Sequence, residues 1–207
     1  MMRMREKLIE VATRQFGESG FEGASTRDIA SAADTTMSNI TYHFGGKQGL
    51  YRAVGQAIVA KMRAVVASAP IAIPADDATD AERIELICAV LQRIGAFMLS
   101  EEAAPMARFV AREQQDPNST MREFLTEGIH DFGLMLEHQL RFLRPEFSSI
   151  ESKTTIFFLI SMAMSLRSAR LSLCIFMGVE GIDERLSQQI LERLDRTARE
   201  VLGASSA

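Results

Sequence analysis

The sequence predicts an all-α protein. Apolar residues recur three and four positions apart along nearly the whole chain, which is the spacing of helices that bury one face. Residues that cap helix starts precede several of these segments, and glycines or prolines follow them. Every element that we identify is helical, and we find no internal repeat or low-complexity tract.

The composition is typical of ordinary soluble globular proteins. The chain has 207 residues, of which 47% are hydrophobic and 24% are charged, so it suits one or two small domains with a sizeable core. No apolar run reaches the ~20 residues needed to span a bilayer, and the N-terminus MMRMREKLIE lacks an apolar signal region. We therefore expect a cytoplasmic protein. We expect Cys88 and Cys174 to be reduced core residues, with a redox-sensing pair as the alternative.

The first predicted helix spans residues 5–18. Leu8, Ala12 and Phe16 repeat at intervals of four and form its apolar row. Gly20 ends this helix, and Phe21 folds back onto it as in a glycine C-cap. We expect this helix to support the helix pair that follows.

The segment 25–47 predicts two short helices joined by a sharp turn. Ser25 and Asp28 have the spacing of a capping box, which begins a helix over 26–33. Asp34 suits the turn because Asp tolerates positive φ better than most non-glycine residues. Thr36 is a suitable N-cap for a second helix over 37–44, and the pair Gly45-Gly46 ends that helix.

The second short helix has an outward face of neutral hydrogen-bonding side chains. Ile40 and Phe44 are four apart and point inward, so Ser38 and Tyr42 point outward. Side chains of this kind read base edges and phosphates in DNA. Periodicity alone fits equally well with a pair of core helices whose outer face is simply solvated.

The segment resembles the DNA-binding signature of the TetR family of bacterial transcriptional regulators. The residues that match are Thr26, Ile29, Ala30, Ala33, Thr36, Ile40, Tyr42, Phe44, Lys47 and Leu50. Three residues depart from the family pattern: Asp34 replaces a glycine, Thr35 a valine, and Thr41 a tyrosine that is common there. The resemblance implies a helix-turn-helix domain in which the second helix enters the major groove.

We predict the DNA contacts from this resemblance and from the helical faces. The predicted phosphate and base contacts are Thr26, Arg27, Thr36, Met37, Ser38, Asn39, Thr41, Tyr42, His43 and Lys47. The net charge of −4 is unevenly distributed, since residues 1–62 contain eight Lys and Arg against six Asp and Glu. The mildly basic N-terminal part therefore suits specific binding to an operator better than general coating of nucleic acid.

Helical patterns continue to the C-terminus. We predict helices over 47–67, 81–100, 105–115, 120–142, 152–176 and 183–202, with a loop at 70–80. We assign residues 1–50 to the helix-turn-helix DNA-binding domain and 51–207 to a helical-bundle domain for ligand binding and dimerisation. The last two helices carry more apolar surface than one small domain covers, so we expect them to form a four-helix bundle with a second copy.

The second domain offers candidates for an effector pocket, because ligand sites in helical bundles lie between the helices. The candidate lining residues are Phe97, Met98, Met106, Phe109, Arg112, His130, Phe132, Met135, Phe158, Met162 and Arg167. Ordinary core packing is the alternative for each apolar residue. Arg167 and Arg170 share a helix face and need partners, for which we consider Glu113, a carboxylate of a dimer mate and an acidic ligand, with an internal ion pair favoured.

A short second resemblance concerns the segment around 105–129. Arg112, Glu113 and Pro117 match a pattern in the effector domain of the CecR/YbiH-like subgroup of TetR regulators.

Together, these features predict a ligand-responsive TetR-type repressor. We expect it to bind a near-palindromic double-stranded DNA operator as a homodimer and to be released by a small-molecule inducer. The alternative is a helical small-molecule-binding protein with little DNA-binding activity. The chain has only three histidines and no Gly-rich phosphate loop, so we expect no enzyme, no metal site, no cofactor and no membrane partner.

Overall fold

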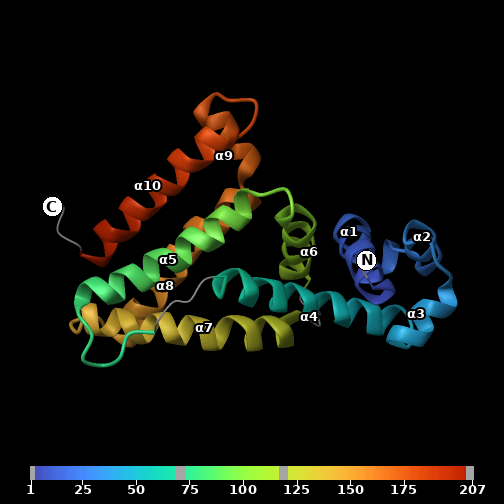
Figure 1. The fold of residues 1–207 in the computed structure, drawn as a ribbon, viewed down its shortest axis with the longest axis horizontal. Coiled ribbons are helices and arrows are strands. Elements are labelled where there is room, and N and C mark those ends of the chain that lie inside the picture. Colours follow the sequence, from blue (N-terminus) through green and yellow to red (C-terminus); the bar gives the residue numbers. More distant parts are fainter. Residues whose placement is uncertain (1–2, 69–72, 117–120, 204–207) are drawn as a thin grey trace. The chain divides into compact units, whose positions relative to one another are not determined.

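The computed structural model describes residues 3–68, 73–116 and 121–203, and of residues 121–129 and 131 it describes the backbone only. These residues form ten helices and no strand, which confirms the all-α prediction (Figure 1). The helices are α1 (Met4–Gly23), α2 (Thr26–Ala32), α3 (Met37–Phe44), α4 (Lys47–Val66), α5 (Asp80–Leu99), α6 (Ala103–Gln115), α7 (Met121–Leu143), α8 (Ser149–Ser168), α9 (Arg170–Met177) and α10 (Glu184–Leu202).

The chain forms two compact units. The first unit contains residues 1–61 together with 102–128, and the second contains 62–101 together with 129–207. The chain therefore leaves the first unit within α4, returns to it at α6, and leaves it again within α7. This division differs from a single boundary after residue 50 because α6 packs with the N-terminal helices.

The first unit has one apolar core. The side chains of α1, α2, α3 and α4 that the helical spacing turns inward are buried in it, among them Leu8, Phe16, Ile29, Ile40 and Leu50. Helix α1 breaks at Gly20, where φ is 74°, as expected for a glycine C-cap. The chain continues helically for three further residues, and the Phe21 ring stacks on Phe16 with centroids 6.2 Å apart.

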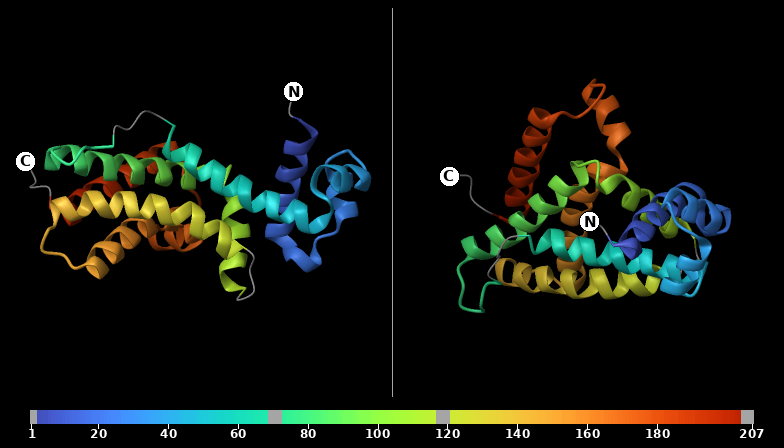
Figure 2. Two further views of the ribbon diagram at one scale, coloured as in Figure 1. Left: turned by 90° about the horizontal axis from the view of Figure 1, so that it is seen from below. Right: turned by 45° about the vertical axis from the view of Figure 1, so that its right-hand side comes forward.

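The second unit is arranged around α5, which packs against α8 and α10 (Figures 1 and 2). Thr79 and Glu82 form a capping box at the start of α5, and most of its residues are buried. Gly95 allows α10 to approach closely, because a Cβ there would lie 2.9 Å from Leu191 and 3.0 Å from Leu194. Methyl groups on both leucines therefore fill the space that a side chain would need.

One predicted helix is wrong in its extent. The pattern over 152–176 predicts a single helix, but the structure divides it at Ala169 into α8 and α9, which are bent by 82°. No glycine or proline stands there, but Arg167 and Arg170 on either side of the break both donate to the C-terminal carbonyls of α5, which fixes the two helices to the same helix end. Among the described residues no single helix has the length and hydropathy to cross a membrane, although the bent pair α8 and α9 together meets that criterion.

The sequence predicts two further helix N-caps, Thr36 for the helix over 37–44 and Ser119 for the helix over 120–142. Thr36 occupies the N-cap position of α3 with extended backbone, but its hydroxyl makes no capping bond, contrary to expectation. The predicted cap of the helix over 120–142, Ser119, lies outside the described residues, as do Pro70 and Pro117.

Candidate nucleic-acid interface

The turn between α2 and α3 is held by local bonds and by one ion pair. Ser25 Oγ accepts hydrogen bonds from the backbone N–H of Arg27 at 3.2 Å and of Asp28 at 3.4 Å, and so begins α2. Asp34 has a φ of 52° in the left-handed region, which confirms its expected place in the turn. Its carboxylate lies 2.6 Å from the Lys7 ammonium of α1, and this bond lowers the pKa of Asp34 below its usual value. The turn is thereby fixed to the helix that supports it.

Helix α3 presents a reading surface made of Met37, Ser38, Thr41 and Tyr42. All four side chains are exposed, Tyr42 to 83% and Met37 to 53%. Ile40 on the opposite side is only 1% exposed, so the helix is anchored in the core by that face. Chemically, the surface offers three hydroxyl groups and one thioether to an external partner.

Two further residues of the predicted contact set are committed to bonds within the unit. Asn39 is half-buried, and its Nδ2 donates to Thr35 Oγ1 at 2.7 Å. Thr26 Oγ1 lies 3.9 Å from the Met37 sulfur and so joins the starts of α2 and α3. The Asn39 side chain therefore stabilises the start of α3 and is less exposed than the side chains of the reading surface.

Lys47, at the start of α4, is only half-buried but is anchored. Its ammonium donates to the Glu22 carbonyl at 3.4 Å and stands 4.6 Å from the centre of the Phe21 ring. His43 is also half-buried and lies between two rings, with centroids 5.0 Å from Tyr42 and 6.0 Å from Phe44. Both side chains are partly exposed and lie at the C-terminal end of α3, next to the reading surface.

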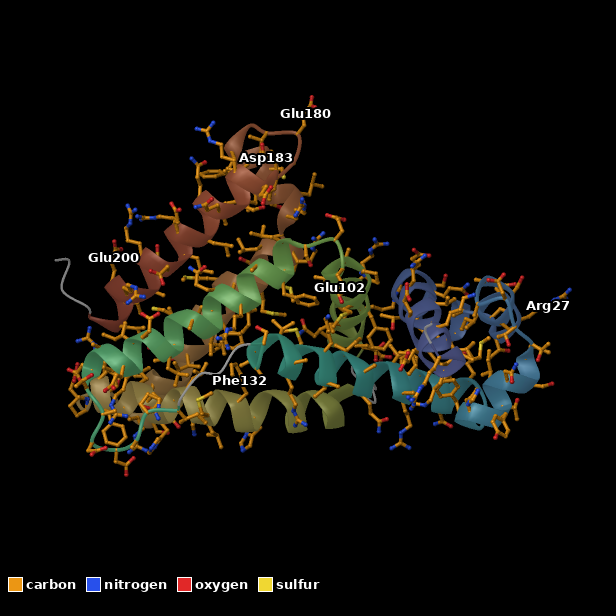
Figure 3. All side chains as sticks on the ribbon, in the orientation of Figure 1. Arg27, Glu102, Phe132, Glu180, Asp183 and Glu200 are labelled. Atoms are coloured by element: carbon orange, nitrogen blue, oxygen red, sulfur yellow. The ribbon has the colours of Figure 1, made fainter. Side chains whose placement is uncertain are left out.

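The remaining predicted contacts are open to solvent. Thr36 and Arg27 are exposed, and Figure 3 shows Arg27 directed away from α2. The structure thus brings the predicted contacts together around α2, α3 and the start of α4.

Three glycines shape the end of α3. Gly45 and Gly46 have φ values of 73° and 120°, which side chains with a Cβ rarely adopt. Gly49 lies so close to the Phe44 carbonyl that a Cβ at this position would overlap its oxygen. The sharp connection from α3 to α4 therefore depends on glycine.

Three residues predicted to line an effector pocket lie instead in the first unit. Phe109 of α6 is 1% exposed, and its ring centroid is 5.2 Å from that of Tyr51. Met106 packs against the same core. Arg112 donates to the backbone carbonyls of Glu18 at 2.9 Å and Gly17 at 3.4 Å, which ties α6 to the end of α1.

A buried polar contact that the sequence analysis missed also joins α6 to this unit. The Tyr51 hydroxyl of α4 donates to the Glu113 carboxylate, and both residues are buried. Burial, followed by the bond to Glu113, raises the pKa of Tyr51 well above its usual value. Tyr51 and Glu113 are 62 residues apart, so no local pattern links them.

The other predicted pocket residues belong to the second unit but differ in burial. Phe97 and Met98 are in the core, Phe132, Met135 and Met162 are half-buried, and His130 and Phe158 are exposed. They do not line an open pocket of about 430 Å³ that lies among the described residues of this unit. That pocket is lined by Asp80, Ala81, Ile84, Glu85, Leu143, Arg144, Arg199, Leu202 and Gly203.

Arg167 has intramolecular partners. Its guanidinium donates to the carbonyls of Met98, Leu99 and Ser100, and it lies 3.5 Å from the Glu101 carboxylate. Arg170 reaches the same carbonyl of Leu99 and the same carboxylate at 3.8 Å. Two arginines thus cap the C-terminus of α5, and their carboxylate partner is Glu101, not Glu113.

Arg83 is a buried cation that the sequence pattern did not reveal. It is 1% exposed and donates to Gln139 Oε1 at 2.5 Å and to the carbonyls of Ala75 and Asp76 at 2.9 and 2.8 Å. Its side chain therefore holds the loop before α5 against α7.

Comparison with known proteins places this geometry in context. Residues 8–54, which include α2, α3 and the turn, match the model of the bacterial regulatory proteins of the tetR family. The dual transcriptional regulator CecR of Shigella flexneri is 31% identical over 121 residues, covering 56% of this chain and 53% of CecR. The transcriptional repressor AcnR of Corynebacterium glutamicum is 37% identical over 62 residues, covering 30% of this chain and 33% of AcnR.

The matches therefore span about half the length of CecR and a third of AcnR. At the level of the fold, the crystal structure of AibR in complex with isovaleryl coenzyme A and operator DNA superimposes with a TM-score of 0.65. That similarity covers 94% of this chain and 97% of AibR at 16% sequence identity. Residues 8–54 of this chain therefore form a domain of the tetR family of bacterial regulatory proteins, and the chain as a whole has the fold of AibR.

Proposed function

We propose that this protein is a ligand-responsive transcriptional regulator that binds a near-palindromic operator as a homodimer. The observation that carries the proposal is the reading surface: Ser38, Thr41 and Tyr42 are exposed on a helix whose opposite face is anchored by Ile40. Such a helix, of eight residues in a helix-turn-helix, has the form that enters a major groove.

The regulatory direction that we propose is repression. AcnR, which resembles the N-terminal part of this chain, is a repressor, whereas CecR is a dual regulator. We propose that a small apolar or partly apolar effector binds in the second unit, near Phe97, Met98 and Met162, and releases the operator. The complex of AibR with isovaleryl coenzyme A and operator DNA supports the general arrangement of one effector and one operator for this fold.

The homodimer that we propose uses α8 and α10. On α8, Phe157 and Phe158 are 65% and 64% exposed, and Val201 on α10 is 42% exposed. The two phenylalanine rings lie side by side, with centroids 6.0 Å apart, and exposed apolar surface of this kind is typical of interfaces because its contact with water is unfavourable. A regulator that binds operator DNA in a bacterium must reach that DNA in the cytoplasm, so we also propose a cytoplasmic location.

Binding of the full-length chain to the DNA upstream of its own gene tests the proposal. We expect a shifted complex whose affinity falls steeply with salt concentration, because phosphate contacts release counterions. Tyr42→Ala should weaken the complex at least ten-fold, since it removes the most exposed side chain of the reading surface. Arg141→Ala, which removes an exposed cation on α7, outside the reading surface and the proposed dimer interface, is the control and should leave affinity unchanged.

Two results would contradict the proposal. One is the absence of specific binding to any fragment selected from genomic or random DNA. The other is an affinity and a salt dependence that are the same in the wild type and in Tyr42→Ala, which would remove α3 from the interface.

A further inference from the structure

Met37 is unusual on the reading surface because it is the one apolar side chain among hydroxyl groups. It is the first residue of α3 and is 53% exposed, whereas Ile40 three residues later is 1% exposed. In the described part of the first unit the other large exposed apolar or aromatic residues are Met4 and Tyr42, and Tyr42 carries a hydroxyl. Packing within the unit therefore does not explain a half-exposed methionine at this place.

The position of Met37 is fixed by its neighbour on α2. Its sulfur lies 3.9 Å from the Thr26 hydroxyl, so the side chain contacts α2 while about half of the residue remains open to solvent. Recognition helices contact base edges with residues near their N-terminus, and Met37 is the N-terminal residue of α3.

The chemistry of the side chain limits what it recognises. A thioether has no N–H or O–H to donate, so it does not bind a phosphate oxygen as Ser38 or Thr41 would. The apolar group that a major groove displays is the C5-methyl of thymine, which proteins contact with apolar side chains. An unbranched methionine adapts its shape to such a methyl group.

We infer that Met37 is a specificity-determining residue that contacts a thymine methyl group in each operator half-site. The inference rests on the proposed operator binding and adds to it the identity of one base that the protein recognises in each half-site. Replacing thymine by deoxyuridine removes this methyl group and leaves base pairing and charge unchanged, so it isolates the contact.

The experiment uses the full-length protein and an operator identified by selection from random DNA. Each thymine is replaced in turn by deoxyuridine, in both half-sites, and affinity is measured by fluorescence anisotropy at one salt concentration. We expect one thymine per half-site at which the wild type binds deoxyuridine about four-fold more weakly, the effect of one methyl group removed from water.

Variants assign the effect to the side chain. Met37→Ala should bind the thymine and deoxyuridine operators equally, and Met37→Leu should keep the preference for thymine. Met4→Ala removes an exposed methionine from α1 in the same unit and should also keep the preference.

Two outcomes overturn the inference while leaving operator binding intact. In one, every deoxyuridine operator binds as tightly as the parent. In the other, the preference for thymine persists undiminished in Met37→Ala. Failure to bind any DNA would instead overturn the proposed function, and the inference with it.

Discussion

The two compact units differ in which large apolar side chains they leave exposed to solvent. In the first unit the described residues leave three of them exposed, Met4, Met37 and Tyr42, and two of these form part of the reading surface. In the second unit the exposed residues include Phe157, Phe158, Leu171, Ile175 and Phe176, concentrated on α8 and α9. The contrast is strongest at Phe176, which is 92% exposed.

This difference indicates that the first unit covers its own core, whereas the second leaves apolar side chains uncovered, on which we propose that a second copy packs. Helix α6 completes the core of the first unit, because its residues Phe109 and Glu113 are buried beside Tyr51. The second unit has a well-packed centre around α5 but uncovered rings on α8. Substitutions in the first unit can therefore test how its core is stabilised, and substitutions in the second can test whether its exposed side chains bind another chain.

The largest effect should follow from Phe109→Ala. Because Phe109 is buried in the core of the first unit, its removal should lower the free energy of unfolding by about 3–5 kcal/mol. Urea denaturation measures this loss, and DNA affinity should fall with the folded fraction. A stable variant with unaltered DNA binding but altered effector affinity would place Phe109 in an effector pocket and break the comparison.

Next in size is the effect of Phe157→Arg on association. An arginine in a buried interface without a partner is unfavourable, so the dimer should dissociate at least ten-fold more readily in sedimentation analysis. The folded monomer should be unaffected because Phe157 is 65% exposed in the single chain. Leu134→Arg, at an exposed position of α7, is the control and should remain dimeric.

Tyr51→Phe tests the buried contact that attaches α6. Losing the hydroxyl that binds Glu113 should cost about 1–3 kcal/mol of unfolding free energy. The pKa of Tyr51 is raised in the folded protein, so this contribution is complete below the ordinary tyrosine pKa of 10.0 and is lost as pH rises above it. Stability of the wild type should therefore decline more steeply above pH 10 than that of Tyr51→Phe.

The chain provides its own control for that pH dependence. Its second tyrosine, Tyr42, is exposed, so Tyr42→Phe should follow the wild-type pH profile. Equal profiles for Tyr51→Phe and the wild type would mean that the Tyr51 proton does not stabilise the first unit.

The smallest effect should come from Asp34→Asn. Asparagine tolerates the positive φ of the turn, so the substitution removes mainly the ion pair with Lys7. The pKa of Asp34 is lowered in the folded protein, so its contribution is present above pH 3.8 and is lost as pH falls through the folded value. Urea denaturation at neutral pH should show a slight loss, and at low pH none.

A double-mutant cycle with Lys7→Gln checks the assignment. The two substitutions should be less than additive, since each removes the same ion pair. Additive effects would show that the carboxylate and the ammonium act on stability independently.

Much of the first unit could be predicted because its features are local. Helical spacing turns Ile40 inward and Tyr42 outward, and a residue that tolerates positive φ marks the turn at Asp34. These properties depend on residues within one or two helical turns. They can be inferred without knowing how distant parts of the chain pack.

The features that escaped prediction are tertiary. The spacing of α6 shows that Phe109 is buried but not which unit buries it. Likewise, Arg167 needed a partner, but most of its acceptors are backbone carbonyls at the end of α5, which no sequence pattern marks. Bonds to the same end of α5 flank the break at Ala169, which no glycine or proline marks in the sequence.

The return of α6 to the first unit matters for protein engineering. A hybrid regulator combines the DNA-binding unit of one protein with the ligand-binding unit of another. A single junction inside α4 would be the simplest design for such a hybrid. In this chain that design would discard Phe109 and Glu113 and strip the covering from Phe16 and Tyr51. A transplantable first unit consists of two stretches of the chain, 1–61 and 102–128, which must be moved together.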